Sequence, residues 1–163
     1  MKCYIDKPYP KVQVERKSDE LASILSHLYA SEEGELTAIH QYSYQSFITL
    51  DDGINKILES ISIVEMHHLE LLGKTIYLLG KDPIFGEWNK KNICYWNSDY
   101  VYYDTDLKTM LEIDIEKEKK AISNYQMVLQ VIEDEFVKKL IKRILEDEYL
   151  HLEIFMKLRQ KYS

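Results

Sequence analysis

Two Glu-x-x-His motifs constrain the fold of this chain more than any other feature of its sequence. They span Glu65–His68 and Glu148–His151, and each lies in a long stretch whose apolar residues recur with helical spacing. Residues i and i+3 of a helix are neighbours on one face, so the glutamate and histidine of each motif project in the same direction. One such motif is a weak signal in an acid-rich chain, whereas two at matched positions predict two equivalent helices.

A lone glutamate precedes each motif by 30 positions, at Glu35 and at Glu118. Halfway along each interval, residues 50–53 and 133–135 have the composition of a turn. Folding each half into an antiparallel helical hairpin at that turn brings its lone glutamate level with its motif. The two halves are related by one offset of 83 positions, which separates these pairs: Glu35 and Glu118, Glu65 and Glu148, His68 and His151, Tyr42 and Tyr125.

This pattern predicts a single all-α domain over residues 1–163, a four-helix bundle made of two antiparallel helix pairs. Helices are expected over about residues 18–50, 54–79, 106–132 and 134–162. Ser18 is a good N-cap for the first helix, and Gly80 followed by Pro83 is a plausible stop for the second. Residues 1–17 are expected to form an extended strap along the bundle.

The second and third helices of such a bundle run parallel, so a long crossover must join them. Residues 81–105 are long enough, and they hold many of the aromatic residues of the chain. We expect these aromatic side chains to clamp the crossover to the bundle wall. The alternative is a contact between subunits, because exposed aromatic patches mark interfaces.

Length and charge narrow the possible functions. The 163 residues, 45% of them apolar, suffice for one domain with a substantial core. A net charge of −7 argues against nucleic acid as a partner, and no apolar run reaches the length of a membrane span. The first ten residues lack the apolar run of a secretory signal, and two cysteines suggest no disulfide framework. A cytoplasmic location is therefore expected.

The bundle would gather four carboxylates and two imidazoles in one layer, the donor set of a dinuclear Fe or Mn site. Two divalent ions would neutralise four carboxylates, which are otherwise costly to bury together. Each residue taken alone has a plainer reading, as a solvated glutamate or a packed core histidine, but the matched spacings favour metal binding. The predicted ligands are Glu35, Glu65, His68, Glu118, Glu148 and His151.

The layer and its spacing resemble the ferritin-like superfamily of dinuclear carboxylate proteins. Residues 34–42 and 144–151 resemble the first and last ligand helices of bacterioferritin. Met66 stands where bacterioferritin has its haem-ligating methionine, but helix methionines usually serve packing and we do not expect haem. Asp114 stands where an aspartate of that family orients a ligand histidine, and a surface acid is an equal alternative. For Tyr42 and Tyr125, core packing is favoured over a bond to the site.

Other segments are similar to manganese catalases and their spore-coat relatives. These are residues 9–16 of the strap, the Gly34-Glu35-Leu36 entry, and Trp96 with Tyr100-Val101 in the crossover. Lys117 stands where many of those catalases have an arginine beside the ligand glutamate. The chain lacks the two Cys-x-x-Cys pairs of a rubredoxin module, so a full-length rubrerythrin is excluded, and short rubrerythrin-like proteins remain possible.

The resemblance implies an oxidoreductase whose two Mn or Fe ions turn over hydrogen peroxide, with Glu65 or Glu148 relaying protons as catalytic residues. The alternatives are a ferroxidase that stores iron, acting on dioxygen or peroxide, and a structural spore-coat component. The resemblance also implies a homo-oligomer. The sequence does not choose between the metals, because Mn(II) and Fe(II) both lie at the weak end of the affinity order.

Overall fold

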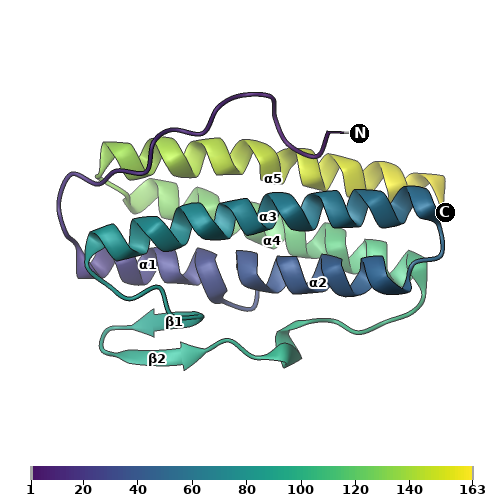
Figure 1. The fold of residues 1–163 in the computed structure, drawn as a ribbon, viewed down its shortest axis with the longest axis horizontal. Coiled ribbons are helices and arrows are strands. Elements are labelled where there is room, and N and C mark those ends of the chain that lie inside the picture. Colours follow the sequence, from purple (N-terminus) through teal and green to yellow (C-terminus); the bar gives the residue numbers. More distant parts are fainter. Residues whose placement is uncertain (1, 163) are drawn as a thin grey trace.

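The computed structural model describes residues 2–162; Met1, which the expected strap includes, and Ser163 lie outside this range. It confirms the all-α four-helix bundle, in which the first long element is split in two (Figure 1). The first two pieces pack on the third helix, and the fourth packs on the fifth. The helices are α1 (Asp19–Ala30), α2 (Glu35–Ile48), α3 (Asp52–Leu79), α4 (Leu107–Val131) and α5 (Glu135–Lys161).

Side-chain caps fix where four of the helices begin. Ser18 accepts from the Leu21 amide at the start of α1. Asp51, Asp106 and Asp134 accept backbone amides at the starts of α3, α4 and α5. Each cap contributes about 1 kcal/mol to helix stability. Two of them, Asp51 and Asp134, lie in the two predicted turns, so each hairpin reverses where the sequence indicates.

The expected continuous helix over residues 18–50 is wrong in one respect, because it breaks between Ala30 and Glu35. Gly34 is the N-cap of α2, and a Cβ built on it would lie only 2.7 Å from the Ser31 nitrogen. The Thr37 hydroxyl donates to the Ser31 carbonyl at 2.7 Å and satisfies an acceptor that the break exposes. The break makes Glu35 the first residue of a helix instead of an interior one.

The crossover contains a small hairpin that the sequence analysis did not foresee. Strands β1 (Gly86–Asn89) and β2 (Asn92–Tyr95) pair antiparallel and are followed by a 3₁₀ turn, η1 (Ser98–Tyr100). The Trp96 indole donates to Thr37 at 2.9 Å, and the Gln41 amide pairs with both backbone groups of Tyr102 at 2.8 and 2.7 Å. These contacts clamp the crossover to α2, while Tyr95 and other aromatic residues stay exposed.

Residues 2–17 form no helix or strand and lie along the outside of α3 and α5 (Figure 1). The strap is bound at both ends. Near its start, the Ile5 amide donates to Asp147 at 2.7 Å. Towards its end, the Glu15 amide donates to Asp134 at 2.7 Å.

The apolar core is divided in two by a polar layer across the middle of the bundle. One part surrounds Leu72 of α3 and Ile144 of α5, and the other surrounds Leu58 of α3 and Phe155 of α5. The predicted ligand positions of both helices fall between these residues, so apolar packing fixes the layer from both sides. In the described part of the chain, none of the helices combines the length and apolar character needed to cross a bilayer.

We predict that Gly34→Ala destabilises the protein by about 1–3 kcal/mol, because the added methyl group overlaps backbone atoms that cannot move without opening the turn. Thermal or urea unfolding measures the change. Gly53→Ala is the matched control, since the nearest atom to its Cβ is a side-chain oxygen of Asp51 at 3.1 Å. Equal stability of the Gly34 variant and the parent would contradict the close approach.

Candidate metal centre

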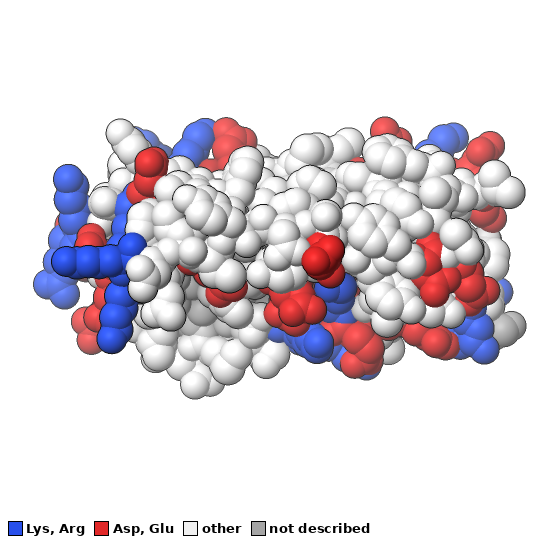
Figure 2. All heavy atoms as spheres, turned by 90° about the horizontal axis from the view of Figure 1, so that it is seen from below, with Lys and Arg blue, Asp and Glu red and all other residues white. Residues whose placement is uncertain are grey.

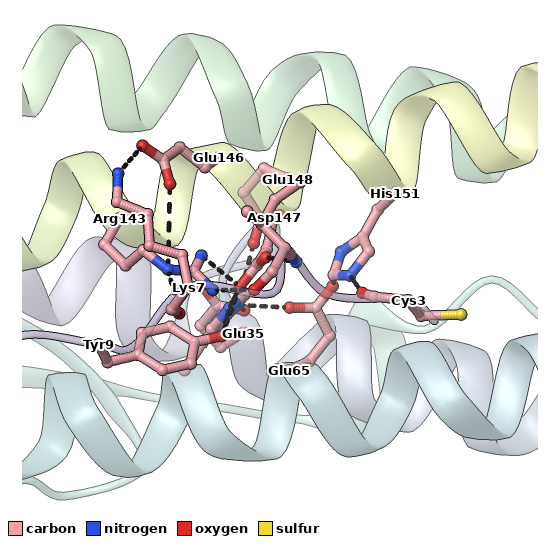
Figure 3. Close-up of polar contacts among 12 residues, drawn as sticks. Cys3, Lys7, Tyr9, Glu35, Glu65, Arg143, Glu146, Asp147, Glu148 and His151 are labelled. Carbon is pink, nitrogen blue, oxygen red and sulfur yellow. Dashed lines mark hydrogen bonds and ion pairs between the residues drawn. The ribbon is translucent and has the colours of Figure 1, made fainter. Parts of the chain in front are cut away.

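All six predicted ligands meet in one buried layer, contributed by α2, α3, α4 and α5. Figure 3 labels four of them, Glu35, Glu65, Glu148 and His151. None of their side chains is more than slightly exposed. Their donor atoms form two overlapping groups, and within each group the atoms lie within 4.8 Å of one another. The first group is Glu35, Glu65, His68 and Glu148, and the second is Glu65, Glu118, Glu148 and His151.

Two glutamates belong to both groups, so they are the residues placed to bridge two ions. Glu65 shows this directly: its Oε2 lies 2.9 Å from His68 Nδ1, and its Oε1 lies 2.9 Å from His151 Nδ1. Each oxygen of one carboxylate therefore faces a different imidazole. Glu148 Oε1 lies 3.0 Å from His68 Nδ1. Glu35 and Glu118 belong to one group each and would be the terminal carboxylates of the two positions.

The two histidines present the same ring nitrogen to the layer, and their Nε2 atoms point away from it. His151 Nε2 lies 2.8 Å from the Cys3 carbonyl oxygen, which can only accept a hydrogen bond. Nε2 therefore carries a proton, and a neutral ring has its lone pair on Nδ1. His68 Nε2 lies 3.2 Å from Asp147 Oδ2 and 3.2 Å from the Tyr9 hydroxyl. A carboxylate also only accepts, so the same tautomer follows for His68.

Several buried polar atoms in the layer support a metal site. Among the described residues, no hydrogen bond of acceptable geometry reaches Glu65 Oε1, Glu118 Oε2, Glu148 Oε1 or His151 Nδ1. A buried polar atom without a partner costs about 1–3 kcal/mol. Close approach without hydrogen-bond geometry is what ligands of a common ion show. Carboxylate oxygens with imidazole nitrogens fit Fe or Mn, and the residues present therefore fit a dinuclear centre.

Without metal, the layer must hold protons. Burial, together with the carboxylates of Glu148 and Glu65, raises the pKa of Glu35 well above its ordinary value. Burial and the same two neighbours raise the pKa of Glu118 in the same way. Burial also acts to raise the pKa of Glu65, but the imidazole of His151 and that of His68 outweigh it and hold that pKa low. Carboxylates packed this closely cannot all ionise.

Burial acts to lower the pKa of both histidines, but the surrounding carboxylates outweigh it. The pKa of His68 is raised well above its ordinary value, with Glu35 and Asp147 the largest opposing influences. Glu65 raises the pKa of His151. In the metal-free protein each imidazole therefore tends to be protonated.

Two buried tyrosines bond the terminal carboxylates in a crossed pattern. Tyr42, seven residues after Glu35, donates to Glu118 Oε1, and Tyr125, seven residues after Glu118, donates to Glu35 Oε1. The sequence analysis favoured core packing for both, and the structure adds a hydrogen bond to each. Each bond occupies one oxygen of the terminal carboxylate and thereby orients the other.

Behind His68 lie residues that were not among the predicted site residues. Asp147 is fully buried and accepts from the Tyr9 hydroxyl as well as facing His68 Nε2. Burial acts to raise the pKa of Asp147, but hydrogen bonds from His68 and from the Ile5 amide lower it to about 2. Arg143, one turn earlier in α5, lies 2.9 Å from Asp147. The available signal was this i, i+4 pair of opposite charges directly before Glu148.

Asp114 does not contact a ligand histidine, so the orienting role that the resemblance implied is absent. Its carboxylate is fully buried and accepts from the Gln45 amide at 2.8 Å. Burial raises the pKa of Asp114 to about 8. The surface-acid alternative is wrong as well. Met66 lies half exposed on α3, away from the layer.

A narrow pocket reaches the layer from the surface between α2 and α4. Its outer wall includes Glu32, Glu33 and Gly34 from the helix break, together with Lys117. The Lys117 amine donates to the Tyr100 carbonyl at 3.3 Å, and burial lowers its pKa. Of the six predicted ligands, those that line the inner end are Glu35, Glu118 and Glu148.

Comparisons with known proteins identify relatives of three kinds. The family described as Rubrerythrin matches residues 26–159. A probable manganese catalase of Clostridium acetobutylicum is 25% identical over 93% of this chain and 75% of its own length. Bacterioferritin of Desulfovibrio desulfuricans is 28% identical over 83% of this chain and 74% of its own. Protein CotJC of Bacillus subtilis is 27% identical over 88% of this chain and 84% of its own length.

Solved structures agree with these sequence matches. KatB, a manganese catalase from Anabaena, superposes with a TM-score of 0.87 at 26% identity, covering 98% of this chain and 80% of its own. The Desulfovibrio desulfuricans bacterioferritin gives a TM-score of 0.72 at 26% identity, covering 86% of this chain and 78% of its own. The bundle is therefore ferritin-like, as the sequence analysis expected.

We predict that Glu118→Ala lowers the metal content below two ions per chain while the bundle stays folded. The substitution removes one ligand and also one of the carboxylates that repel each other in the metal-free layer. Elemental analysis after loading with Mn(II) measures the stoichiometry, and Glu116→Ala on the exposed face of α4 is the control. Two ions bound with the parent's affinity would show that Glu118 is not a ligand.

We also predict that the chelator-treated, metal-free protein loses stability as the pH rises from about 5 to 8. Glu35 and Glu118 keep protons in the folded state that the unfolded chain releases above about pH 4.5, and His68 and His151 keep theirs above about 6.5. The folded state thus binds more protons in this window, so its free energy of unfolding falls with rising pH.

Urea unfolding at pH 5, 6.5 and 8 tests this dependence. The lowered pKa values of Glu65 and Asp147 act in the opposite direction, but only below about pH 4.5. Saturating metal should reverse the trend, because protons and metal compete for the same atoms. A metal-free protein whose stability rises between pH 5 and 8 would contradict the assigned pKa directions.

Proposed function

The chain belongs to the rubrerythrin family, and on that premise we propose that it is an oxidoreductase acting on hydrogen peroxide at a dinuclear Mn or Fe centre. One position would be held by Glu35 and His68, and the other by Glu118 and His151. Glu65 and Glu148 would bridge the two. When bound, the pair of ions supplies reversible two-electron redox chemistry.

The pocket beside the helix break is the observation that carries this proposal. It leads from solvent to the terminal carboxylates, and its lining leaves room only for small molecules. The break that forms its outer wall depends on Gly34, where no side chain fits. A direct route from solvent suits repeated turnover of a small neutral substrate.

The bridging glutamates differ in their suitability for moving protons. Glu148 lines the pocket, and burial together with Glu65 raises its pKa. Its carboxylate is therefore the bridging group that a small molecule in the pocket can reach, as a proton acceptor must be. Glu65 does not line the pocket, and its pKa is held low by the histidines. We assign proton transfer to Glu148 and a fixed bridging role to Glu65.

The similarity to known structures favours the catalase type over the storage type. The manganese catalase KatB covers 98% of this chain with a TM-score of 0.87, against 86% and 0.72 for the bacterioferritin at the same identity. A ferroxidase that stores iron remains the second candidate, because the bacterioferritin relative is 28% identical. A coat component like protein CotJC is the third.

We also propose that the chain forms a small homo-oligomer. Figure 2 shows the face that carries the crossover and α2, and large parts of it are free of charged side chains. In a chain with net charge −7, such a face lets two copies meet without strong repulsion. The exposed apolar side chains of these segments include Phe47, Phe85, Tyr95 and Tyr103.

We predict that the Mn-loaded protein evolves oxygen from hydrogen peroxide, and that Glu148→Gln lowers the rate per bound Mn by about 100-fold or more, as expected for loss of a general base. An oxygen electrode and elemental analysis on the same sample measure both quantities. Glu153→Gln is the control, since Glu153 is exposed on α5 and pairs with Lys157.

Light scattering on the same preparation separates the storage alternative. We expect a dimer up to a hexamer. A 24-subunit particle that takes up hundreds of irons and evolves no oxygen from peroxide would establish the ferroxidase reading in place of the proposed function.

A further inference from the structure

We propose that residues 3–9 of the strap are a positioning element of the metal centre, and that docking of the strap and binding of metal stabilise each other. The proposal rests on the metal centre described above, but not on the substrate assigned to it. It follows from one arrangement: the strap contacts the outward nitrogen of both ligand histidines.

The contact with His151 is made by the backbone of the strap. The Cys3 carbonyl accepts from His151 Nε2 at 2.8 Å, and Cys3 is itself buried. This acceptor keeps the proton on Nε2 and the lone pair on Nδ1, towards the carboxylates. If the strap left, the ring would lose the partner that fixes its tautomer and rotation. A ligand that must be ordered at the moment of binding binds metal less tightly.

The contact with His68 is made by a side chain. The Tyr9 hydroxyl donates to Asp147 Oδ2 and lies 3.2 Å from His68 Nε2. Asp147 Oδ2 lies at the same distance from Nε2. Tyr9 therefore closes a triangle that holds both the carboxylate and the imidazole. Figure 3 shows the Tyr9 ring extending from the strap to this cluster.

Arg143 of α5 binds the strap without touching either histidine. Its Nε donates to the Lys7 carbonyl at 3.0 Å, and its Nη2 donates to the Ile5 carbonyl at 2.8 Å. Its guanidinium also lies 4.2 Å from the centre of the Tyr9 ring. On the other side of the chain, the Ile5 amide donates to Asp147 Oδ1 at 2.7 Å. A single buried Arg–Asp pair thus holds the strap segment on which the histidine contacts depend.

These contacts couple two equilibria. The strap has no helix or sheet of its own, so its position depends on the groups it contacts in α3 and α5. Metal fixes the two imidazoles, and fixed imidazoles are better partners for the strap. By linkage, the factor by which a docked strap tightens metal binding equals the factor by which bound metal tightens docking.

The experiment measures both sides of this linkage with Mn(II) alone as the probe. Tyr9→Phe removes the hydroxyl and keeps the ring over Arg143. Arg143→Lys loosens the strap and keeps every group that contacts a histidine, although it changes the contacts of Arg143 with Asp147 and with the Tyr9 ring. Tyr4→Phe is the matched control, because Tyr4 is an exposed tyrosine on the same strap. We expect Mn(II) affinity to fall by about 10-fold to 100-fold in the first two variants and to stay unchanged in the third.

Hydrogen exchange of the Ile5 amide gives the reciprocal readout in the parent protein. Saturating Mn(II) should slow this exchange, and the slowing should be smaller in Tyr9→Phe. If the strap only stabilised the fold, the substitutions would lower the unfolding temperature of the metal-free protein. They would leave the Mn(II) affinity and the effect of Mn(II) on Ile5 exchange unchanged.

Every outcome of these measurements either supports or overturns the proposal. The proposal is overturned if Tyr9→Phe binds Mn(II) with the affinity of the parent, or if Mn(II) does not change the exchange rate of the Ile5 amide. This holds even if the protein evolves oxygen from peroxide. Weakened Mn(II) binding with metal-dependent exchange supports it even if no oxygen is evolved. A parent protein that binds no Mn(II) overturns the metal centre and this proposal together.

Discussion

The cost of burying four carboxylates in one layer governs the rest of this structure. Their mutual repulsion and lost hydration must be offset by protons, imidazoles or metal ions, and all three compete for the same few oxygens. The two apolar clusters on either side hold the helices together firmly enough to keep that layer closed. Tyr42 and Tyr125 then direct the terminal carboxylates inward. The site is thus an unfavourable arrangement maintained by favourable packing around it.

The meeting of the four glutamates and two histidines in one layer could be predicted because helical spacing and the repeat are properties of the sequence alone. The offset of 83 positions placed all six residues, and the turn composition placed both hairpins. The helix break at residues 31–34 could not be predicted, since Gly34 is tolerated inside helices and only the close approach of Ser31 shows its purpose. The crossover hairpin and the Tyr9–Asp147 contact are equally invisible, because they join segments with no common periodicity.

The internal repeat is exact for the ligands and fails for what surrounds them. His68 faces a carboxylate and a phenol, whereas His151 faces a backbone carbonyl. A carboxylate partner makes an imidazole a stronger donor than a carbonyl does. Glu35 begins a helix, where the positive end of the helix dipole favours its charged form, while Glu118 lies inside α4. The two metal positions would therefore differ in how strongly their ligands donate electrons, although the ligand types are the same.

The strap also determines when the centre can be completed during synthesis. The hydrogen bond between Cys3 and His151 spans 148 positions, and the one between Ile5 and Asp147 spans 142. The strap therefore leaves the ribosome well before α5 and must wait for that helix before it finds its partners. Contacts of such high sequence separation form late, after local helices and hairpins. A nascent chain can hold most of its bundle and still have no finished site, so metal acquisition is expected to follow the formation of α5.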